Sequence, residues 1–544
     1  MYQQDFNPTG SLLLSALLAA LPLATVLVLL GALKWKAHWA GLSGLVVGLV
    51  VAIAAYGMPV AQALDAGLFG GARAVLLILW ITFNAIWIYN LTVKTGHFAV
   101  LQRAFTGISD DQRIQAIVIA FCFGALIEAL AGGGSPIAIC AIMLIALGFS
   151  PLKAAALALV ANTAPVAFGG MGNPITILGT VTESDPSVFG AMAGRQTAFV
   201  AIFVPFILLF IADGRRGLRQ AWPAALVAGL AFGATQIVVS STFDYRLTDI
   251  AASLVSAVVL IAFGKVWKPG EVVAPAPVIA GGSVDDPAFV RKTGGADTTA
   301  DKILAFAPYA IIIVLFSLSV IEPIKTWLTQ SWATAKFLWP GSDITNPAGK
   351  PVKVEYVLNW ASAPGTLLFL SGVVTVLVLR IPIGTAIRTY GETLRQFGWA
   401  IVTILAVFAL AFVMQYSGQI QTLGLFLAEA GTLFAFLSPV VGWFGVAITG
   451  TDAGSNALFG VLQTTAAGKL GEAPALFGAA NSTGGVMAKM ISPQSLAIGA
   501  AAVGIVGQEG EMFRKVIGWS VVLLLAVCVL VFLQSTPVLG WMVP

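Results

Sequence analysis

Charged residues are scarce in this sequence. Only 10% of its 544 residues are Asp, Glu, Lys or Arg, whereas a soluble domain carries roughly 25%. Hydrophobic residues make up 58% of the chain, and the mean hydropathy is +0.94. Such a chain cannot cover a water-facing surface with polar groups, so we expect a polytopic membrane protein whose surroundings are the lipid bilayer. The net charge of +4 gives no indication of nucleic-acid binding.

Cysteine and histidine are also rare. Cys122, Cys140 and Cys528 lie in apolar runs without a CxxC pair or a nearby histidine, which argues against a disulfide framework or a metal site. His38 and His97 flank apolar segments, which argues against a histidine proton relay through the membrane core. Because the sequence also lacks a nucleophile–base pair, a metal-ligand cluster and an ATP-binding loop, we expect neither an enzyme nor a protein with a bound cofactor.

The long apolar runs divide into two halves. They favour an all-α polytopic membrane protein with roughly 12–16 membrane segments, several of them short enough to be half-helices or arms of re-entrant hairpins. A charged stretch with Pro and Gly at 268–302 separates a first membrane unit, 1–267, from a second, 303–544. The first ten residues lack the basic residues of a signal peptide, so the run Ser11–Gly31 is expected to remain as a span.

Two polar interruptions occur in the apolar sequence of each half, and their spacings match. In the first half, Ser135 of a glycine-rich turn precedes Asn162 by 27 positions; in the second, Ser455 precedes Asn481 by 26. Each of these Asn residues is followed 12 positions later by a proline. Paired Gly- and Pro-interrupted segments at corresponding places in two halves point to the midplane binding site of a secondary transporter.

Basic residues in short loops set the expected orientation. Lys34 and Lys36 follow the first apolar run, and Arg215, Arg216 and Arg219 follow a later one. Placing these residues inside puts the N-terminus on the periplasmic side and the linker between the halves in the cytoplasm. The second half then begins its crossings in the direction opposite to the first, which predicts two inverted-topology repeats.

Several motifs resemble those of the L-lactate permease family. They are Phe121-Cys122-Phe123-Gly124-Ala125 with Glu128, Asn162-Thr163-Ala164-Pro165, Thr449-Gly450-Thr451-Asp452, Ser455-Asn456-Ala457-Leu458-Phe459-Gly460 and Lys489-Met490-Ile491-Ser492-Pro493. The resemblance covers most of the chain and implies a bacterial inner-membrane symporter that moves lactate, glycolate or related 2-hydroxycarboxylates with protons. It also implies kinship with the ion-transporter superfamily of inverted hairpin repeats and, by analogy, a homodimer. One departure is Gly133, which stands where the family's first hairpin usually has Phe and which would enlarge the site.

A small carboxylate in a low-dielectric site needs hydrogen-bond donors and positive potential. Half-helix N-termini and glycine-rich turns supply both. Small polar residues also cap broken helices or join neighbouring helices, and that interpretation stays open for each candidate. The candidate substrate-binding residues are Gly132, Gly134, Ser135, Asn162, Thr163, Ser455, Asn456, Asn481, Ser482, Thr483 and Lys489.

Three ionisable residues lie in or beside the interruptions. A charge at the bilayer centre costs about 2.5–3.5 kcal/mol even on insertion scales, so each of them is a functional hypothesis. Glu128 is the first candidate for a proton carrier and Asp452 the second, although Asp452 could instead pair with Lys489 or cap a half-helix. Lys489 would either attract the substrate carboxylate or neutralise a buried acid.

Two alternatives to proton symport remain. A sodium-coupled carboxylate symporter would use the same scaffold, with Na⁺ held by backbone carbonyls near Asn162 and Asn481. An anion channel is the other alternative, and it would need a continuous polar path. In a carrier of either kind, Ser135, Asn162, Ser455 and Asn481 should converge on one shared cavity.

Overall fold

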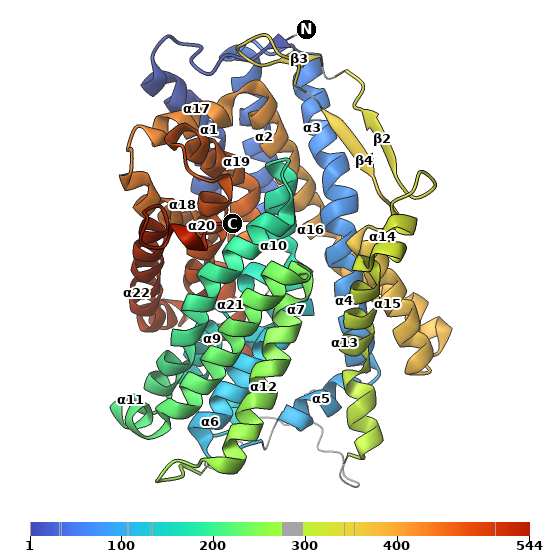
Figure 1. Ribbon diagram of the computed structural model, residues 1–544, viewed down its shortest axis with the longest axis vertical. Coiled ribbons are helices and arrows are strands. Elements are labelled where there is room, and N and C mark those ends of the chain that lie inside the picture. Colours follow the sequence, from blue (N-terminus) through green and yellow to red (C-terminus); the bar gives the residue numbers. More distant parts are fainter. Residues whose placement is uncertain are drawn as a thin grey trace.

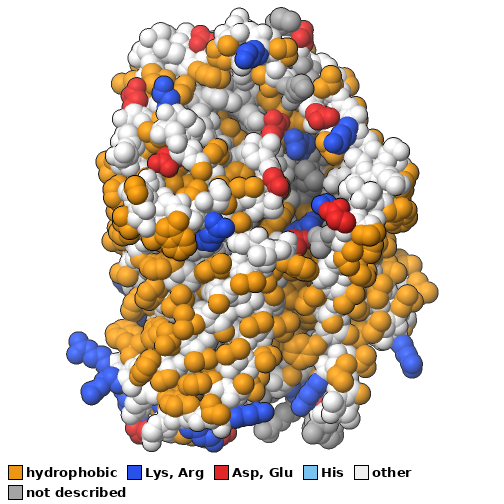
Figure 2. Space-filling view, viewed as in Figure 1, with side chains coloured by type: hydrophobic (Ala, Val, Ile, Leu, Met, Phe, Trp, Pro, Cys, Tyr) orange, Lys and Arg blue, Asp and Glu red, His pale blue; other side chains and the backbone are white. Residues whose placement is uncertain are grey.

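The computed structural model is mostly helical, and it describes residues 2–31, 33, 35–105, 108–130, 132, 134–274, 297–341, 343–352, 354–505 and 508–544. Seven of the described helices are long and apolar enough to cross a membrane, or eight if one bent pair counts as a span. Shorter apolar helices of 10–17 residues accompany them. Figure 2 shows a broad apolar belt, with most charged side chains above and below it. The expected all-α polytopic class is confirmed.

The first unit carries the first pair of interruptions in its second part (Figure 1). Its helices are α1 (Leu12–Gly31), α2 (Ala37–Ala54), α3 (Val60–Ala74), the π-helical turn η1 (Val75–Leu79), α4 (Trp80–Lys94), α5 (His97–Phe105), α6 (Gln112–Ala116), the π-helical turn η2 (Ile117–Phe123), α7 (Gly124–Leu130), α8 (Ser135–Ala146), α9 (Pro151–Ala161), the 3₁₀ turn η3 (Val166–Phe168), α10 (Gly169–Val181), α11 (Pro186–Thr242), the 3₁₀ turn η4 (Tyr245–Leu247) and α12 (Thr248–Val266).

The chain breaks twice between α7 and α10. Gly134, with a left-handed φ of 96°, begins α8 after the turn that follows α7. The helix α9 ends before Asn162, and η3 and α10 continue at an angle of 62° to it. Gly170 and Gly172 also have left-handed backbones, a conformation that glycine adopts without a steric penalty. At both breaks the backbone leaves regular helical hydrogen bonding, which frees polar groups inside the protein.

The 57-residue helix α11 is a hairpin of two arms. Its backbone reverses at Asp213 and Gly214, and a Cβ on Gly229 would lie 2.7 Å from the carbonyl oxygen of Ile202. Glycines let two helix backbones approach this closely.

The second unit repeats the order of a hairpin followed by a broken helix. Its elements are α13 (Thr299–Val320), α14 (Glu322–Leu328), the strands β2 (Ala335–Leu338), β3 (Ile344–Thr345) and β4 (Glu355–Leu358), α15 (Pro364–Val378), α16 (Ile383–Ser417), α17 (Gln419–Ala428), α18 (Leu433–Thr449), α19 (Asp452–Leu470), α20 (Pro474–Ala488), the 3₁₀ turn η6 (Lys489–Ile491), α21 (Pro493–Ala502), α22 (Glu509–Gln534) and the 3₁₀ turn η7 (Gly540–Met542).

The second pair of breaks also depends on glycine and on helix capping. Gly450, with a left-handed φ of 77°, ends α18, and the side chain of Thr451 accepts a hydrogen bond from the Gly454 amide at the start of α19. The helix α20 passes through η6 before α21 begins at Pro493. The fold therefore places two breaks in each unit; three of them lie where the sequence predicted interruptions, whereas the fourth lies at η6 and not at Asn481.

The two paired asparagines do not occupy equivalent positions. The helices α9 and α20 both begin with a proline, Pro151 and Pro474, and both lead into a 3₁₀ turn. Asn162 directly follows α9, whereas Asn481 lies inside α20, which continues to Ala488. Equal spacing in the sequence therefore does not give equivalent positions: relative to the 3₁₀ turn that follows each helix, Asn481 lies about one helical turn earlier than Asn162. The inverted relation of the two units, with their bounds at 267 and 303, stays a prediction.

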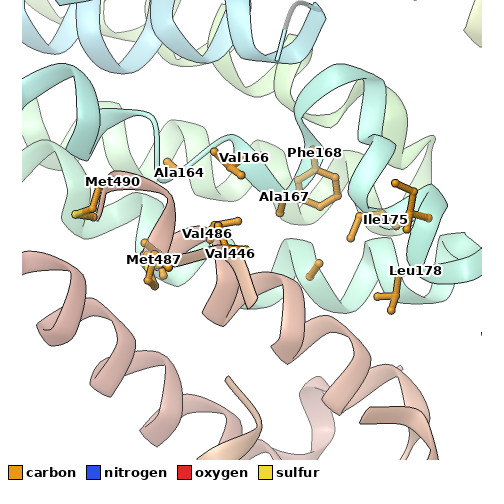
Figure 3. Packing of buried hydrophobic residues seen from close by; sticks show 14 of the residues in the cluster. Ala164, Val166, Ala167, Phe168, Ile175, Leu178, Val446, Val486, Met487 and Met490 are labelled. Atoms are coloured by element: carbon orange, nitrogen blue, oxygen red, sulfur yellow. The ribbon is translucent and has the colours of Figure 1, made fainter. Parts of the chain in front are cut away.

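The two units pack closely against each other around the breaks. The helix α10 contacts α19, α11 contacts α20, and α8 contacts α21. Figure 3 shows the apolar side chains at this junction, with Val166 and Phe168 of η3 on one side and Val486 and Met490 on the other. This packing encloses both broken helices in protein, as their exposed backbone groups require.

The ends of the molecule hold features that composition did not predict. The strand β1 (Tyr2–Gln3) pairs with β3 in parallel, and β2 pairs with β4 in antiparallel orientation. Figure 1 places these strands at the end of the molecule opposite the chain ends that flank 275–296, residues outside the described part. The three cysteines are buried and unpaired, as the sequence predicted.

Replacing Gly442 by alanine should destabilise the fold. A Cβ on Gly442 would lie 1.9 Å from the carbonyl oxygen of Asn481, so α18 and α20 would have to separate. We expect a loss of about 1–3 kcal/mol, typical of overpacking, measured as a lower Tm of the purified protein in detergent. Gly468→Ala is the matched control, because no atom lies within 4 Å of its added Cβ, and its Tm should not fall. Equal Tm values for the two variants would contradict the close packing.

Candidate functional site

The four breaks meet in the interior of the protein. A Cβ on Gly132 would lie 3.7 Å from the backbone nitrogen of Gly170, so the α7–α8 turn touches the α9–α10 break. The side chain of Asn456 on α19 donates to the carbonyl oxygen of Pro174 on α10 at 3.1 Å, which joins the two units. Lys489 of η6 donates to the carbonyl oxygen of Gly450 at 2.7 Å. The four breaks therefore lie close together, whereas the expected cavity shared by Ser135, Asn162, Ser455 and Asn481 stays a prediction.

Glu128 lies in this region with 3% of its surface exposed. A Cβ on Gly169 would lie 2.7 Å from its Oε1, so only glycine leaves room for the carboxyl at the start of α10. Its Oε2 makes no hydrogen bond with a described residue. The carboxyl interacts electrostatically with Lys489 of the second unit. Glu128 is thus a buried acid that faces the junction with one oxygen unused.

Lys489 interacts with two buried acids. Its ammonium group interacts electrostatically with both Glu128 and Asp452, and its side chain is 3% exposed. The hydroxyl of Ser482 donates to one oxygen of Asp452, whereas Asp452 Oδ1 makes no hydrogen bond with a described residue. One positive charge therefore interacts with two carboxyl groups, so a third anionic group would be costly to bury here without a neutralising cation.

Asn162 and Thr163 supply hydrogen-bonding groups that the fold leaves unused. Asn162 faces the carboxyl of Glu128, but within the described chain neither its Nδ2 nor its Oδ1 makes a hydrogen bond of normal geometry. The Oγ1 of Thr163 is likewise unpartnered, and both side chains are buried. Buried polar atoms normally have partners, so unused donors and acceptors beside an acid indicate a site for a ligand or an ion.

Asn481 belongs to a different kind of cluster. Its Nδ2 donates to Asn456 Oδ1 at 2.9 Å and to Ser455 Oγ at 3.3 Å, and its Oδ1 accepts from Gln463 at 3.2 Å. Gln463 is itself bonded to the hydroxyl and carbonyl groups of Ser438. Every hydrogen-bonding atom of the Asn481 side chain therefore has a partner, and the cluster joins α18, α19 and α20.

The remaining sequence candidates are distributed around these two clusters. Thr483 donates to Gln196 of α11 at 2.9 Å, so its hydroxyl joins α20 to α11. Gly134 packs beside Ile498 of α21, where a Cβ would lie 2.5 Å from Cδ1. The side chain of Ser135 lies outside the described part of the chain. Of the candidates, the structure gathers Gly132, Glu128, Asn162, Asp452, Ser482 and Lys489 around the central junction, and it places Ser455, Asn456 and Asn481 in the adjoining network.

Comparison with known proteins places the chain in a family. The sequence profile of the L-lactate permease family matches residues 15–538. The chain belongs to the L-lactate permease family. Its relatives include the glycolate permease GlcA of Escherichia coli K12, 38% identical over 560 residues with 100% of this chain and 99% of the relative covered. The L-lactate permease of Salmonella typhi is 40% identical over 555 residues, with both chains fully covered.

Members of the family from distant bacteria share the same length. The L-lactate permease of Bacillus subtilis is 38% identical over 562 residues with complete coverage of both chains. Among solved structures, the YdaH transporter of Alcanivorax borkumensis aligns over 98% of this chain and 99% of its own at 15% identity, with a TM-score of 0.45. These relatives are named permeases, so this member of the L-lactate permease family is a membrane transport protein and not an enzyme, as the sequence predicted.

Sequence reasoning missed several buried polar residues of this permease. Gln196, Gln236 and Gln463 connect helices through their amide groups, but single amides in apolar runs carried no recognisable spacing. Asp249 was missed because it belongs to no motif or matched spacing in the sequence. In the structure Asp249 is fully buried in the first turn of α12.

An open cleft of about 480 Å³ lies on the side of the molecule where the strands are found. Figure 2 shows it as a hollow rimmed by charged side chains of both signs. Arg246 pairs with Asp244 at 2.7 Å in this cleft, and Tyr245 at its wall contacts Thr176 of α10 at 2.9 Å. Outside the cleft lining, Glu183 lies 3.6 Å from Arg73. The cleft reaches α10 about one turn beyond its left-handed segment.

Proposed function

We propose that this protein carries L-lactate, glycolate or a related 2-hydroxy-monocarboxylate across the bacterial inner membrane in symport with protons. The names of its full-length relatives, L-lactate permease and glycolate permease, support the substrate class. The absence of a protein-bound cofactor is part of the proposal, since the coupling ion supplies the driving force.

One observation carries the coupling proposal. Buried Glu128, with Oε2 unused, faces Asn162, whose amide is also unused, and the Glu128 carboxyl interacts electrostatically with the ammonium group of Lys489. The substrate carboxylate would bind near Lys489 and accept from Asn162 Nδ2, while its 2-hydroxyl would bond to Thr163 or Asn162 Oδ1. The N-terminal ends of α8, α10 and α21 add backbone donors and positive potential.

Electrostatics gives the reason for coupling. An anion that enters a site with two acids and one lysine adds a second excess negative charge in low dielectric, which is costly unless it is neutralised. A proton on Glu128 removes that excess, so substrate and proton should bind together. Asp452, already bonded to Ser482, is the second candidate for the proton.

A sodium-coupled carrier is the alternative that the geometry favours next. Glu128 Oε2, Asn162 Oδ1 and Thr163 Oγ1 are unpartnered oxygens, and oxygen ligands suit a hard cation. Sodium would then neutralise the site in place of the proton.

Uptake into proteoliposomes separates these proposals. The purified protein is reconstituted, and uptake of labelled L-lactate, glycolate and a panel of other small carboxylates is measured under an imposed pH gradient or sodium gradient. We expect saturable accumulation of L-lactate or glycolate with the pH gradient alone. Accumulation that requires sodium would establish the alternative, and conductance without saturation would indicate a channel.

The two asparagines should behave differently on replacement by alanine. Asn162→Ala removes unused groups, so we expect substrate affinity to fall about 3- to 10-fold, the value of one neutral hydrogen bond, with an unchanged Tm. Asn481→Ala leaves Asn456 and Gln463 without their partner and should cost about 1–3 kcal/mol of stability. Substrate-binding titrations and thermal melts of both variants check this contrast. If Asn481→Ala instead weakened substrate binding while Asn162→Ala lowered the Tm, the substrate would bind at the Asn481 cluster.

A further inference from the structure

Asp249 is a buried acid that the proposed transport cycle has not yet used. It lies in the first turn of α12 and is 0% exposed. The amide Nε2 of Gln236 donates to its Oδ1 at 3.2 Å, while its Oδ2 makes no hydrogen bond with a described residue. Burial of an ionisable acid within a membrane protein costs free energy, so such a residue is a functional hypothesis.

Gln236 connects this acid to the first broken helix. The same Nε2 donates to the carbonyl oxygen of Ala164 at 3.4 Å, and Ala164 lies in the break between α9 and η3. Ala164 directly follows Thr163 and Asn162. The Oε1 of Gln236 has no partner among the described residues. One amide group therefore bridges the acid on α12 and the backbone that positions the candidate substrate ligands.

Within the described part of the chain, no basic side chain makes a hydrogen bond or ion pair with Asp249. The helix α11 faces it with the neutral Gln236, and Glu128 of α7 is the charged group with which it interacts electrostatically. Arg246 makes a bidentate contact with Asp244 at 2.7–3.1 Å, so its charge is already matched. Among the described elements packed against α12, the titratable groups are Arg195, Asp213, Arg215, Arg216 and Arg219 on α11, Glu128 on α7, Cys122 on η2 and Tyr245 and Arg246 on η4, with Asp244 directly before η4. Of these, Glu128 is the group that interacts electrostatically with Asp249.

We propose that Asp249 is a second proton-binding group of this permease, coupled to Glu128 and linked through Gln236 to the α9–α10 break. This inference rests on the proposed proton symport. The proton binds to Asp249 Oδ2 from water and leaves to water, and no other bond is made or broken. When Asp249 is protonated, its carboxyl O–H can donate to the unused Oε1 of Gln236. The ionised acid attracts the Gln236 amide more strongly and weakens its bond to Ala164. Asp249 is therefore a positioning residue whose charge state acts on Asn162 and Thr163 through the backbone.

The proposal predicts a change in proton linkage. For the purified protein, the slope of log Kd for L-lactate against pH gives the number of protons bound with the substrate, and each contributes up to a tenfold change in Kd per pH unit. Within the pH range in which Asp249 titrates, log Kd should change more steeply with pH in wild type than in Asp249→Asn. The difference should reach up to a tenfold change in Kd per pH unit. Asn keeps the acceptor for Gln236 but cannot bind a proton. Ser256→Ala, on the same helix and bonded to the Ala228 carbonyl, should keep the wild-type slope.

A second measurement needs no substrate. The protonated carboxyl band in the infrared spectrum should titrate with pH in wild type and in Ser256→Ala, and one component should be missing in Asp249→Asn. Wild-type slopes together with an unchanged infrared titration in Asp249→Asn would overturn the proposal. If the Asp249 band titrates but neither L-lactate nor glycolate binds to wild type, the proposed substrate class fails and the proton site stands. A loss of affinity in Asp249→Asn that is equal at every pH, with no missing band, would assign Asp249 a structural role.

Discussion

Replacement of Glu128 by glutamine is expected to abolish proton-driven accumulation of L-lactate while exchange of substrate between the two sides continues. Glutamine has nearly the same shape, so it fits beside Gly169, but it cannot bind a proton. Electroneutral symport of one proton with one monovalent anion can accumulate the anion up to about tenfold per unit of imposed pH gradient, the energy of that gradient. In Glu128→Gln this ratio should fall to about one.

Reconstituted vesicles allow both activities to be measured on one preparation. Net uptake is followed under a pH gradient, and exchange is followed as counterflow of labelled L-lactate against an internal pool. Glu322→Gln is the matched control, since this acid is exposed on α14 and its change should leave both activities intact. Undiminished accumulation in Glu128→Gln would show that another group binds the coupling proton. Loss of both accumulation and counterflow would show that Glu128 is a substrate ligand.

Removal of the Lys489 charge should have the second large effect. Its ammonium group interacts with both Glu128 and Asp452, so Lys489→Met leaves two acids without their shared cation. A hydrogen bond to a charged group contributes about 1.5–3 kcal/mol, so we expect the Kd for L-lactate to rise about 10- to 150-fold. Titration of the purified variant in detergent measures this change.

A double replacement separates binding from folding. Lys489→Met alone leaves Glu128 and Asp452 without their positive neighbour and should lower the Tm, whereas Lys489→Met with Asp452→Asn leaves only Glu128 without its cation and should restore part of the Tm. The weak binding should persist in the double variant. Lys469→Met, at the end of α19, is the control for loss of a lysine. Recovery of substrate affinity together with the Tm would show that Lys489 has only a structural role.

The sequence carried enough information to locate the breaks and the ionisable residues. Glycine-rich and capping residues interrupted the apolar runs near Gly134 and Asp452, so these two breaks could be predicted, whereas the small polar run at Asn481 continues α20. Buried charges in a membrane are costly, which is why Glu128, Asp452 and Lys489 were recognisable without a structure. The type of a single residue was therefore enough to identify a candidate site residue where its position in an apolar run was clear.

The register of the second broken helix could not be predicted. Asn481 and Gly485 lie four positions apart, on the same face of α20, so a spacing argument cannot decide which of them corresponds to Asn162. The partners of Asn481 come from α18 and α19, and the sequence does not show which helices adjoin. For the same reason the connection from Asp249 through Gln236 to Ala164 needed the structure.

The periplasmic N-terminus, the inverted repeats and the homodimer stay predictions. Each could be tested directly, the first by the side from which an engineered terminal label is accessible.

The buried thiols of this permease allow one introduced cysteine to be labelled selectively. Because Cys122, Cys140 and Cys528 are all shielded from water, a polar maleimide should react poorly with the native chain. A cysteine placed at exposed Ser184 on the rim of the charged cleft would then carry a fluorophore at one defined point. Its emission could report in real time how that rim moves while substrate is bound and released, without prior removal of the native sulfhydryls.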